Sequence, residues 1–373
     1  MTIEPRASGL PSSDLEVMPT VNPYQEWQQQ ERLPRITGFY VDDLATVEVA
    51  DWASHGGLGA FVNLEGTGGV NDLQILEIPA GRASAEVHHL FEVLAYVVAG
   101  RGSASVWYDQ SQRSTFEFGA GSVFSIPLNA TYRVFNTSGT QPVRLIMVTN
   151  APLIMNLFHS SEFIFDNPFV FRDRFGGEPR YFSGSGKLYR RDRNHIWETN
   201  FVPDVRTLGL YEWQARGAGG RNVLMELAHS SMSAHVSEFP VGTYKKAHRH
   251  GPGAHVIILD GKGFSTLWQA GDNAVRCDWK PNSVVVPPAN WFHQHFNTGD
   301  RPARYLALKF SGRRYYISPE FAPGKSDVDV NLGGHQIEYQ DEEPAVHTTF
   351  EAELAANGGA CQMKGMIAAC TAT

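Results

Sequence analysis

Short runs of apolar and β-branched residues, separated by Gly, Pro and Asn, recur along most of this 373-residue chain. Clear examples are HVIILDG, FSTLW, NSVVVPP and ARYLALKF, at positions 255–261, 264–268, 282–288 and 303–310. Runs of this length and composition are typical of β-strands bounded by turns. We find no regular alternation with helical segments, which would indicate a parallel α/β sheet. The pattern therefore predicts an all-β fold, with one short helix near the C-terminus at HTTFEAELAANGG, residues 347–359.

The strand pattern occurs twice, with a constant offset. The segment VVAGRGSASVWYD at 97–109 matches ILDGKGFSTLWQA at 258–270, and their shared Gly, Gly and Trp positions are 161 residues apart. The same offset relates four further pairs: Gly81 with Gly242, Pro127 with Pro288, Asn129 with Asn290, and Asn136 with Asn297. Many short strands in two copies predict two tandem barrels. We expect a first barrel at residues 1–160, an inter-barrel segment at 161–205, and a second barrel with a C-terminal extension at 206–373.

Charge and composition narrow the class of protein. The net charge of −8 argues against a nucleic-acid surface, and the one basic run, KLYRRDRNH at 187–195, is interpreted as an exposed loop. No segment is long and apolar enough to cross a membrane, and residues 1–21 lack the apolar stretch of a signal peptide. Three cysteines without paired spacing fit a reducing compartment, and Cys361 and Cys370 look incidental beside Cys277. We therefore expect a cytoplasmic protein that binds neither nucleic acid nor membrane.

Histidines gather in two places of the second copy. The segment KKAHRHGPGAH at 245–255 contains His248 and His250, and WFHQHFN at 291–297 contains His293. Residues two apart in a strand face the same way, so the first pair can meet His293 from a neighbouring strand. A single buried histidine is usually just hydrogen-bonded, but three at this spacing suit Fe, Zn, Cu or Ni. We predict a metal site with His248, His250 and His293 as ligands.

These residues resemble the two cupin motifs, Gly-x5-His-x-His-x3,4-Glu-x6-Gly and Gly-x5-Pro-x-Gly-x2-His-x3-Asn. The matching residues are Gly242, His248, His250 and Gly261, then Pro288, His293 and Asn297. Asn282 and Asn290 stand where the family has Gly, and Asn tolerates the same turn conformations. The resemblance covers about residues 75–148 and 236–310. It implies a bicupin, with one double-stranded β-helix (jelly-roll) barrel in each copy.

One departure from the motif changes the expected ligand set. Ala254 occupies the position where many cupins have a ligand Glu, so the site would have three neutral histidines. The segments HRHGPGA and WFHQHFN are similar to the gentisate 1,2-dioxygenase group, which includes hydroxynaphthoate and salicylate ring-cleaving enzymes. In that group the iron lies in the N-terminal barrel, whereas the complete motif here is C-terminal. The resemblance implies Fe(II) as cofactor, with Zn, Mn and Ni as alternatives.

The first copy lacks most of the motif. The residues at its four ligand positions, equivalent to 248, 250, 254 and 293, are Val87, His89, Val93 and Tyr132. One imidazole and one phenol do not make a metal site, even with His88 and Glu92 nearby. We interpret this barrel as kept for packing and for contacts in a homo-oligomer, a state that bicupins often adopt.

Two further histidines are candidate catalytic residues. His295 is two positions from His293, so an uninterrupted strand would turn it into the same cavity, as a substrate or proton-transfer group. His255 has the opposite parity to His250, but the intervening Gly-Pro-Gly segment makes parity a weak guide there.

Two other residues are candidates for substrate binding. Arg304 could pair with a substrate carboxylate, but Arg144 matches it in the first copy, which fits a structural role equally well. Trp268 could line a pocket for a flat substrate, although alternating aromatic residues in a barrel more often belong to the core.

Three facial ligands on a six-coordinate metal leave positions for a chelating substrate and for dioxygen. Three neutral ligands also leave the full dication charge, which favours an anionic substrate such as a hydroxy-carboxylate or an enolate. The leading hypothesis is a mononuclear non-haem Fe(II) dioxygenase that uses O2 to cleave a C–C bond of a small oxygenated acid, hydroxy-aromatic or enolizable. The alternatives are a Zn, Mn or Ni isomerase, lyase or hydrolase without O2 chemistry, and a non-catalytic cupin that binds a small molecule.

Overall fold

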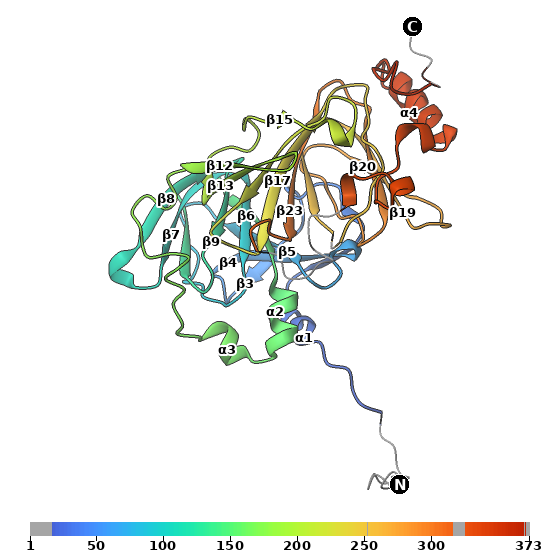
Figure 1. The fold of residues 1–373 in the computed structure, drawn as a ribbon. Coiled ribbons are helices and arrows are strands. Elements are labelled where there is room, and N and C mark those ends of the chain that lie inside the picture. Colours follow the sequence, from blue (N-terminus) through green and yellow to red (C-terminus); the bar gives the residue numbers. More distant parts are fainter. Residues whose placement is uncertain (1–16, 252, 316–324, 369, 371–373) are drawn as a thin grey trace, which may run out of the picture.

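The computed structural model describes residues 17–251, 253–315, 325–368 and 370. It has two β barrels side by side, the first in blue and teal and the second in yellow and orange (Figure 1). The expected all-β fold with two tandem barrels is confirmed. Residues 1–16 lie outside the described residues, and they make up most of the stretch 1–21 that was predicted not to be a signal peptide. Pro252 of the Gly-Pro-Gly segment also lies outside them. No helix within the described ranges is long and apolar enough to span a membrane.

The first barrel pairs a large sheet with a small one. Its strands are β1 (Arg35–Gly38), β3 (Ala50–Trp52), β4 (Gly57–Leu64), β5 (Asp72–Ile78), β6 (Val93–Ala99), β7 (Arg101–Trp107), β8 (Ser114–Gly119), β9 (Val123–Ile126), β10 (Thr131–Asn136), β11 (Val143–Thr149) and the later β14 (Phe201–Val202). The large sheet runs β1-β4-β5-β11-β6-β9-β14 with β3 on β4, and the small sheet runs β10-β7-β8. Apolar side chains, among them Phe61, Leu76, Phe124 and Leu145, fill the space between the sheets.

The second barrel repeats this plan. Its strands are β2 (Tyr40–Val41), β12 (Gly186–Arg191), β13 (Asn194–Thr199), β15 (Tyr211–Glu212), β16 (Arg221–Glu226), β17 (Met232–Phe239), β18 (His255–Asp260), β19 (Gly263–Trp268), β20 (Val275–Trp279), β21 (Val284–Val285), β22 (Phe292–Asn297) and β23 (Ala303–Phe310). The large sheet runs β12-β13-β16-β17-β23-β18-β21-β2 with β15 on β16, and the small sheet runs β20-β19-β22. The basic run at 187–195 was expected to be a loop; it instead forms the antiparallel hairpin of β12 and β13, whose charged side chains face solvent.

The repeat extends further upstream than the motifs. β1 runs parallel to β4 from Arg35, and β13 runs parallel to β16 from Ile196, again 161 residues apart. The chain then crosses over, so that β2 pairs with β21 of the second barrel and β14 pairs with β9 of the first. β2 precedes most of the first barrel in the chain but belongs to the large sheet of the second barrel. β14 precedes most of the second barrel but belongs to the large sheet of the first. The division at residues 160 and 205 stays a prediction, but strand pairing crosses it.

Two equivalent arginines fasten these crossing segments. Arg144 pairs with Glu77 at 2.7 Å and donates to the carbonyl oxygens of residues 44, 45 and 47. Arg304 pairs with Glu238 at 2.9 Å and donates to the carbonyl oxygens of residues 205 and 208. Buried carbonyl groups need such partners because they have left water. The guanidinium of Arg304 is therefore occupied in joining the barrels.

The two large sheets pack back to back. One apolar cluster joins Ile75, Leu94 and Ile146 of the first barrel to Val236 and Leu306 of the second. Burying this surface is the main force that holds the barrels together. The short helices α1 (Pro23–Glu31), α2 (Ala151–Phe158) and α3 (Ser161–Phe165) lie together beside the first barrel (Figure 1).

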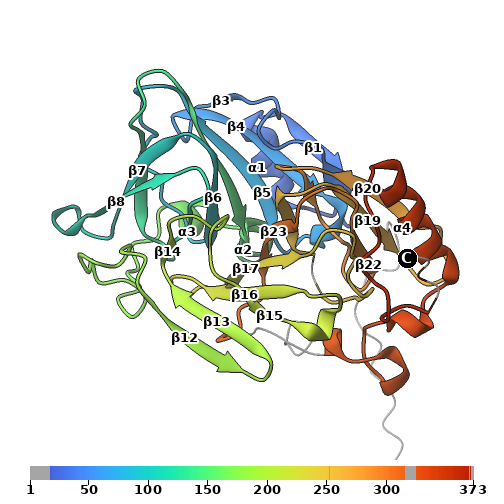
Figure 2. The ribbon, with the colours of Figure 1, turned by 90° about the horizontal axis from the view of Figure 1, so that it is seen from above.

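The predicted C-terminal helix is confirmed as α4 (Pro344–Ala356), which ends before Gly358 at a positive φ of 76°. It covers the outer side of the second barrel, against β19 and β22 (Figure 2). Phe350 and Leu354 of the helix pack on Phe264 and Phe296 of those strands. α4 therefore covers the outer face of the strand that carries His293 on its inner face.

Candidate metal centre in the second barrel

The three predicted ligands meet inside the second barrel. The segment that follows β17 runs alongside β22, where His248 and His293 form an antiparallel bridge. The backbone nitrogen of His248 lies 3.1 Å from the carbonyl oxygen of His293, and the nitrogen of His293 lies 2.8 Å from the carbonyl oxygen of His248. His250 lies two residues further along, on the same side of the segment. One nitrogen from each of the three rings lies within 4.8 Å of the others. Asn282 and Asn290, expected to replace turn glycines, have positive φ angles of 70° and 64°.

Each of the three rings is held by its Nδ1 atom. The Nδ1 atoms of His248, His250 and His293 lie 3.3, 3.1 and 3.3 Å from the carbonyl oxygens of residues 246, 251 and 291. A carbonyl oxygen only accepts, so each Nδ1 carries the proton and donates it. Each Nε2 then keeps its lone pair, and a backbone partner that fixes the tautomer is the usual support of a metal-ligating histidine. The donor set therefore fits a divalent transition metal.

Burial keeps these imidazoles neutral. It lowers the pKa of His293 to about 3, and it lowers the pKa values of His248 and His250 well below the usual range, with help from Arg216 and from the neighbouring rings. A protonated ring could not bind a metal. The lone pairs are thus available throughout the neutral pH range.

The ligands open into a cavity of about 650 Å³ inside the barrel. Ala254 lines it, so no carboxylate occupies the position of the Glu in the cupin motif. Four basic residues also line it, and they are Arg193, Arg216, Lys309 and Arg313; the lining also includes the acidic residues Asp192, Asp327, Asp329 and Glu338. The Nε atoms of Arg216 and Arg313 are buried and have no hydrogen-bond partner within the described part of the chain. Burial lowers the pKa of Lys309 to about 7, with a further contribution from Arg313.

His295 also lines the cavity, next to His293 with ring centroids 5.7 Å apart. Its Nδ1 lies 2.7 Å from the Oγ of Ser265, which accepts a hydrogen bond from the Trp279 indole at 3.0 Å. The indole can only donate, and Nδ1 is the one acceptor near the buried serine hydroxyl among the described residues. The hydroxyl therefore donates to Nδ1, which leaves the proton of His295 on Nε2. Burial lowers the pKa of His295 well below its usual value, so the ring is neutral.

A buried lysine–tyrosine pair forms the next layer. The Nζ atom of Lys245 donates to the Tyr305 hydroxyl at 2.9 Å and to Ser237. Burial is the largest single influence and would raise the pKa of Tyr305. The charge and hydrogen bond of Lys245, the hydrogen bond of Ser237 and the charge of Arg216 together outweigh it, and the net shift is downward. Tyr305 lies 5.6 Å from the ring of His295, centroid to centroid, so the pair reaches the cavity through this phenol.

Three other predicted site residues do not line the cavity. His255 lies between Ala254 and Val256, which do, so it points to the opposite face of β18; it is fully buried, and both its ring nitrogens lack a hydrogen-bond partner among the described residues. Arg304 joins the barrels, as described above. Trp268 is half-buried and stacks on Phe292 at 5.7 Å, on the outer face of the small sheet.

The corresponding place in the first barrel is filled. His89 donates from Nδ1 to the carbonyl oxygen of Phe91 at 2.9 Å and stacks on its ring, and its Nε2 lies 3.4 Å from the Tyr132 hydroxyl. Glu92 pairs with Arg174 at 2.8 Å. Among the described residues, no set of three metal-binding side chains converges in this barrel.

Five residues that line the cavity were not predicted from the sequence, and they are Arg216, His235, Tyr305, Lys309 and Arg313. The repeat contained a signal for one of them, Tyr305, and also for Ser237 and Ser265, because their first-barrel counterparts are apolar. By strand register, Leu76 corresponds to Ser237, Leu145 to Tyr305, Ala104 to Ser265, and Val134 to His295. Where one copy of the repeat has a buried polar residue and the other has an apolar residue at the equivalent position, the polar residue indicates a site in its own barrel.

No family model matches the chain, and no curated protein matches it in sequence. Solved structures that resemble it include oxalate decarboxylase from Lactobacillus farciminis in a formate complex, with 13% identity, a TM-score of 0.48 and coverage of 75% of this chain and 88% of that chain. A tryptophan-to-tyrosine variant of oxalate decarboxylase from Bacillus subtilis has 11% identity, a TM-score of 0.48 and coverage of 83% and 88%. Likeness at this level says nothing about the reaction of this chain.

Proposed function

We propose that this protein is a metal-dependent bicupin enzyme, a mononuclear non-haem Fe(II) dioxygenase that cleaves a C–C bond of a small oxygenated acid. The observation that carries the proposal is the convergence of three neutral imidazoles, each with its Nε2 lone pair free, at a cavity whose lining includes the basic residues Arg216, Lys309 and Arg313. His248, His250 and His293 would hold the metal. When bound, Fe(II) supplies Lewis acidity and the redox capacity to use dioxygen.

The residues of the chain have separable tasks in this proposal. Arg216 and Arg313 line the cavity and add positive charge that favours an anionic substrate, and Lys309 adds a titratable charge. Arg216 is itself held by Asp327 at 2.6 Å, so its position does not depend on substrate. His295 presents an N–H from Nε2, which can donate to a developing oxyanion or return a proton. The ligand His293 and the proton group His295 share β22, whereas the charged groups come from Arg216 before β16, Lys309 on β23 and Arg313 just after it.

A second candidate is a Zn, Mn or Ni isomerase, lyase or hydrolase. The observation that favours it is Lys309, whose pKa of about 7 suits proton transfer at neutral pH without dioxygen. Product analysis under isotopically labelled dioxygen separates the two proposals. Label in the cleaved product supports the dioxygenase, and turnover without dioxygen supports the second candidate.

The position of Ala254 gives a prediction about charge. Ala254→Glu should keep or raise metal content, because a carboxylate can join the three imidazoles, but should lower activity at least about 10-fold by repelling an anionic substrate. Ala254→Gln adds the same bulk without charge and is the matched control. Metal content and initial rates are measured for both. Equal activity of the Glu variant and the parent would remove the argument for an anionic chelating substrate.

Lys309 gives a prediction about pH. Its ammonium form is present below its pKa of about 7 and is lost above it, so the Michaelis constant for an anionic substrate should rise as the pH increases through this value. A bound dication lowers the pKa further, which moves the inflection to a lower pH. Lys309→Met should remove the inflection and weaken binding about 10- to 100-fold. Lys187→Met, on the exposed hairpin, is the control; an unchanged profile in Lys309→Met would contradict this role.

A further inference from the structure

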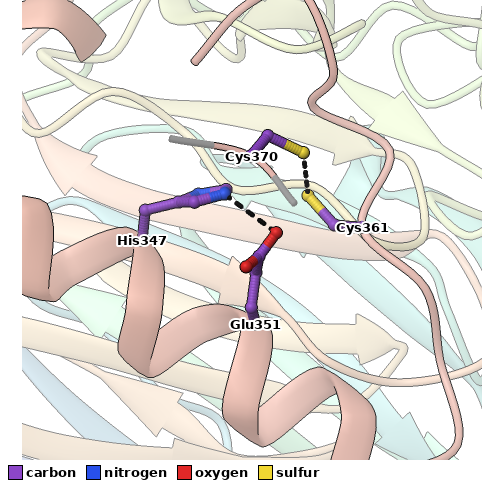
Figure 3. Close-up of side chains that lie close together, drawn as sticks. All are labelled: His347, Glu351, Cys361 and Cys370. Carbon is purple, nitrogen blue, oxygen red and sulfur yellow. Dashed lines mark hydrogen bonds and ion pairs between the residues drawn. The ribbon is translucent and has the colours of Figure 1, made fainter. Parts of the chain in front are cut away.

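A second cluster of metal-binding side chains lies outside the barrel, between α4 and the C-terminal segment. His347 and Glu351 are four residues apart on α4 and point to the same side, toward Cys361 and Cys370 (Figure 3). One donor atom from each of the four residues lies within 4.8 Å of the others. The two Sγ atoms are 3.2 Å apart, and the His347 Nε2 is 3.2 Å from a Glu351 oxygen.

The orientation of His347 leaves its lone pair facing this cluster. Its Nδ1 lies 3.3 Å from the Tyr244 hydroxyl, which itself donates to Glu342 at 3.0 Å. The tyrosine oxygen therefore accepts the Nδ1 proton, and Nε2 is the unprotonated nitrogen. This ring is 3% exposed, and its Nε2 has no hydrogen-bond partner within the described ranges, although Glu351 is close. A lone pair and a carboxylate oxygen at 3.2 Å repel each other unless a proton or a metal cation lies between them.

The chain folds so that the two cysteines meet. Gly365, at a φ of 83°, allows a tight turn, and the amides of Ile367 and Cys370 donate to the carbonyl oxygens of Met363 and Ile367 at 3.2 Å each. The amide of Met363 also points to the Cys361 sulfur at 3.4 Å. A backbone N–H directed at sulfur stabilises negative charge there, as in a thiolate ligand.

We propose that His347, Glu351, Cys361 and Cys370 form a second, structural metal site for a thiophilic divalent cation of the Zn(II) type. Two sulfurs, one imidazole nitrogen and one carboxylate oxygen make a complete four-ligand set, which suits a tetrahedral borderline-soft ion. The Glu342–Tyr244–His347 chain is the outer support that such histidines usually have. Binding releases the two thiol protons to solvent, and no electrons are transferred.

The proposed site would tie the C-terminal segment to the barrel wall. Through Phe350 and Leu354, α4 packs on the outer faces of β19 and β22, whose inner faces carry Ser265 and His295. The amide of Gln362 also donates to the carbonyl oxygen of Gly242 at 2.9 Å. The metal would therefore stabilise the position of α4 while remaining separate from the cavity.

Cobalt(II) substitution distinguishes this site from the histidine cluster, because only this site has sulfur ligands. Reduced full-length protein is stripped of metal and titrated with Co(II). We expect a sulfur-to-cobalt charge-transfer band in the near ultraviolet that saturates at one equivalent per chain. Cys361→Ser with Cys370→Ser should lose the band and one metal equivalent. Cys277→Ala, at the buried third cysteine, and His248→Ala should both keep the band.

Two results would overturn the proposal. One is the absence of the charge-transfer band in parent protein whose circular dichroism shows a normal fold. The other is a mass two hydrogens lower than expected after purification under reducing conditions, which shows a Cys361–Cys370 disulfide in place of a metal site. Both of these results are measured on the parent protein, so the proposal can be tested even if the double cysteine variant does not fold.

Discussion

Alanine at His248, His250 or His293 should remove the metal from the second barrel and abolish turnover. Each ring supplies one of three Nε2 donors, and the two that remain cannot hold a divalent ion against buffer and water. Loss of an outer support alone typically costs 10- to 100-fold in metal affinity, so loss of a ligand should cost at least about 100-fold. Metal content after dialysis against a weak chelator measures the effect directly, and circular dichroism checks the fold.

The first barrel supplies the control for this experiment. His89→Ala changes a buried histidine at the position equivalent to His250, where the neighbouring side chains are aromatic and apolar. It should leave metal content unchanged, because no ligand set converges there among the described residues. Relative to the parent, His293→Ala should lose the one metal equivalent of the histidine cluster, whatever the cysteine cluster holds. No such loss in His293→Ala, or a loss in His89→Ala, would show that the assignment of the two barrels is wrong.

His295→Ala should have the opposite combination of effects: full metal content and a turnover lowered by about 100- to 10,000-fold, the range for loss of a general acid or base. The reason is its position, on the cavity side of β22 beside His293 but directed by Ser265 to present a proton from Nε2. Turnover at saturating substrate and metal content are measured on the same sample.

Ser265→Ala tests how His295 acts. It keeps the imidazole but removes the hydroxyl that orients it, so turnover should fall by less than in His295→Ala while metal content holds. Full turnover of His295→Ala on the true substrate would show that this residue is structural.

The two-barrel fold could be predicted because its determinants are local and repeated. Alternating apolar positions and turn residues mark each strand, and one offset relates the two copies. The crossing of β2 and β14 could not be predicted, because two-residue strands have no pattern of their own. Their partners lie in the other barrel, and the carbonyl groups that Arg144 and Arg304 bind carry no side-chain signature.

The three metal ligands could be predicted from the sequence because motif spacing and the alternation of side chains along a strand depend only on residues a few positions apart. The same reasoning suggested His255 only because the Gly-Pro-Gly segment obscured parity, and the regular alternation of β18 turns that ring away from the cavity. Lys309 and Arg216 lie outside both motifs, 12 residues after Asn297 and 26 residues before Gly242, so only folding brings them to the cavity.

Cys361 and Cys370 looked incidental for the same reason. Their spacing matches no metal motif, and the other two members of their cluster lie on a helix. The turn at Gly365 and the docking of α4 bring these four side chains together, and neither event can be read from the spacing of the cysteines.

Oxygen uptake by iron-loaded protein tests the central claim most directly. Protein reconstituted with Fe(II) is given a panel of small hydroxy-aromatic and enolizable acids in an oxygen electrode, beside His293→Ala treated identically. We expect oxygen uptake that depends on one of these acids, is stoichiometric with product, and is absent in the variant. A histidine cluster that takes up only zinc, with no oxygen consumption on any acid, would contradict it.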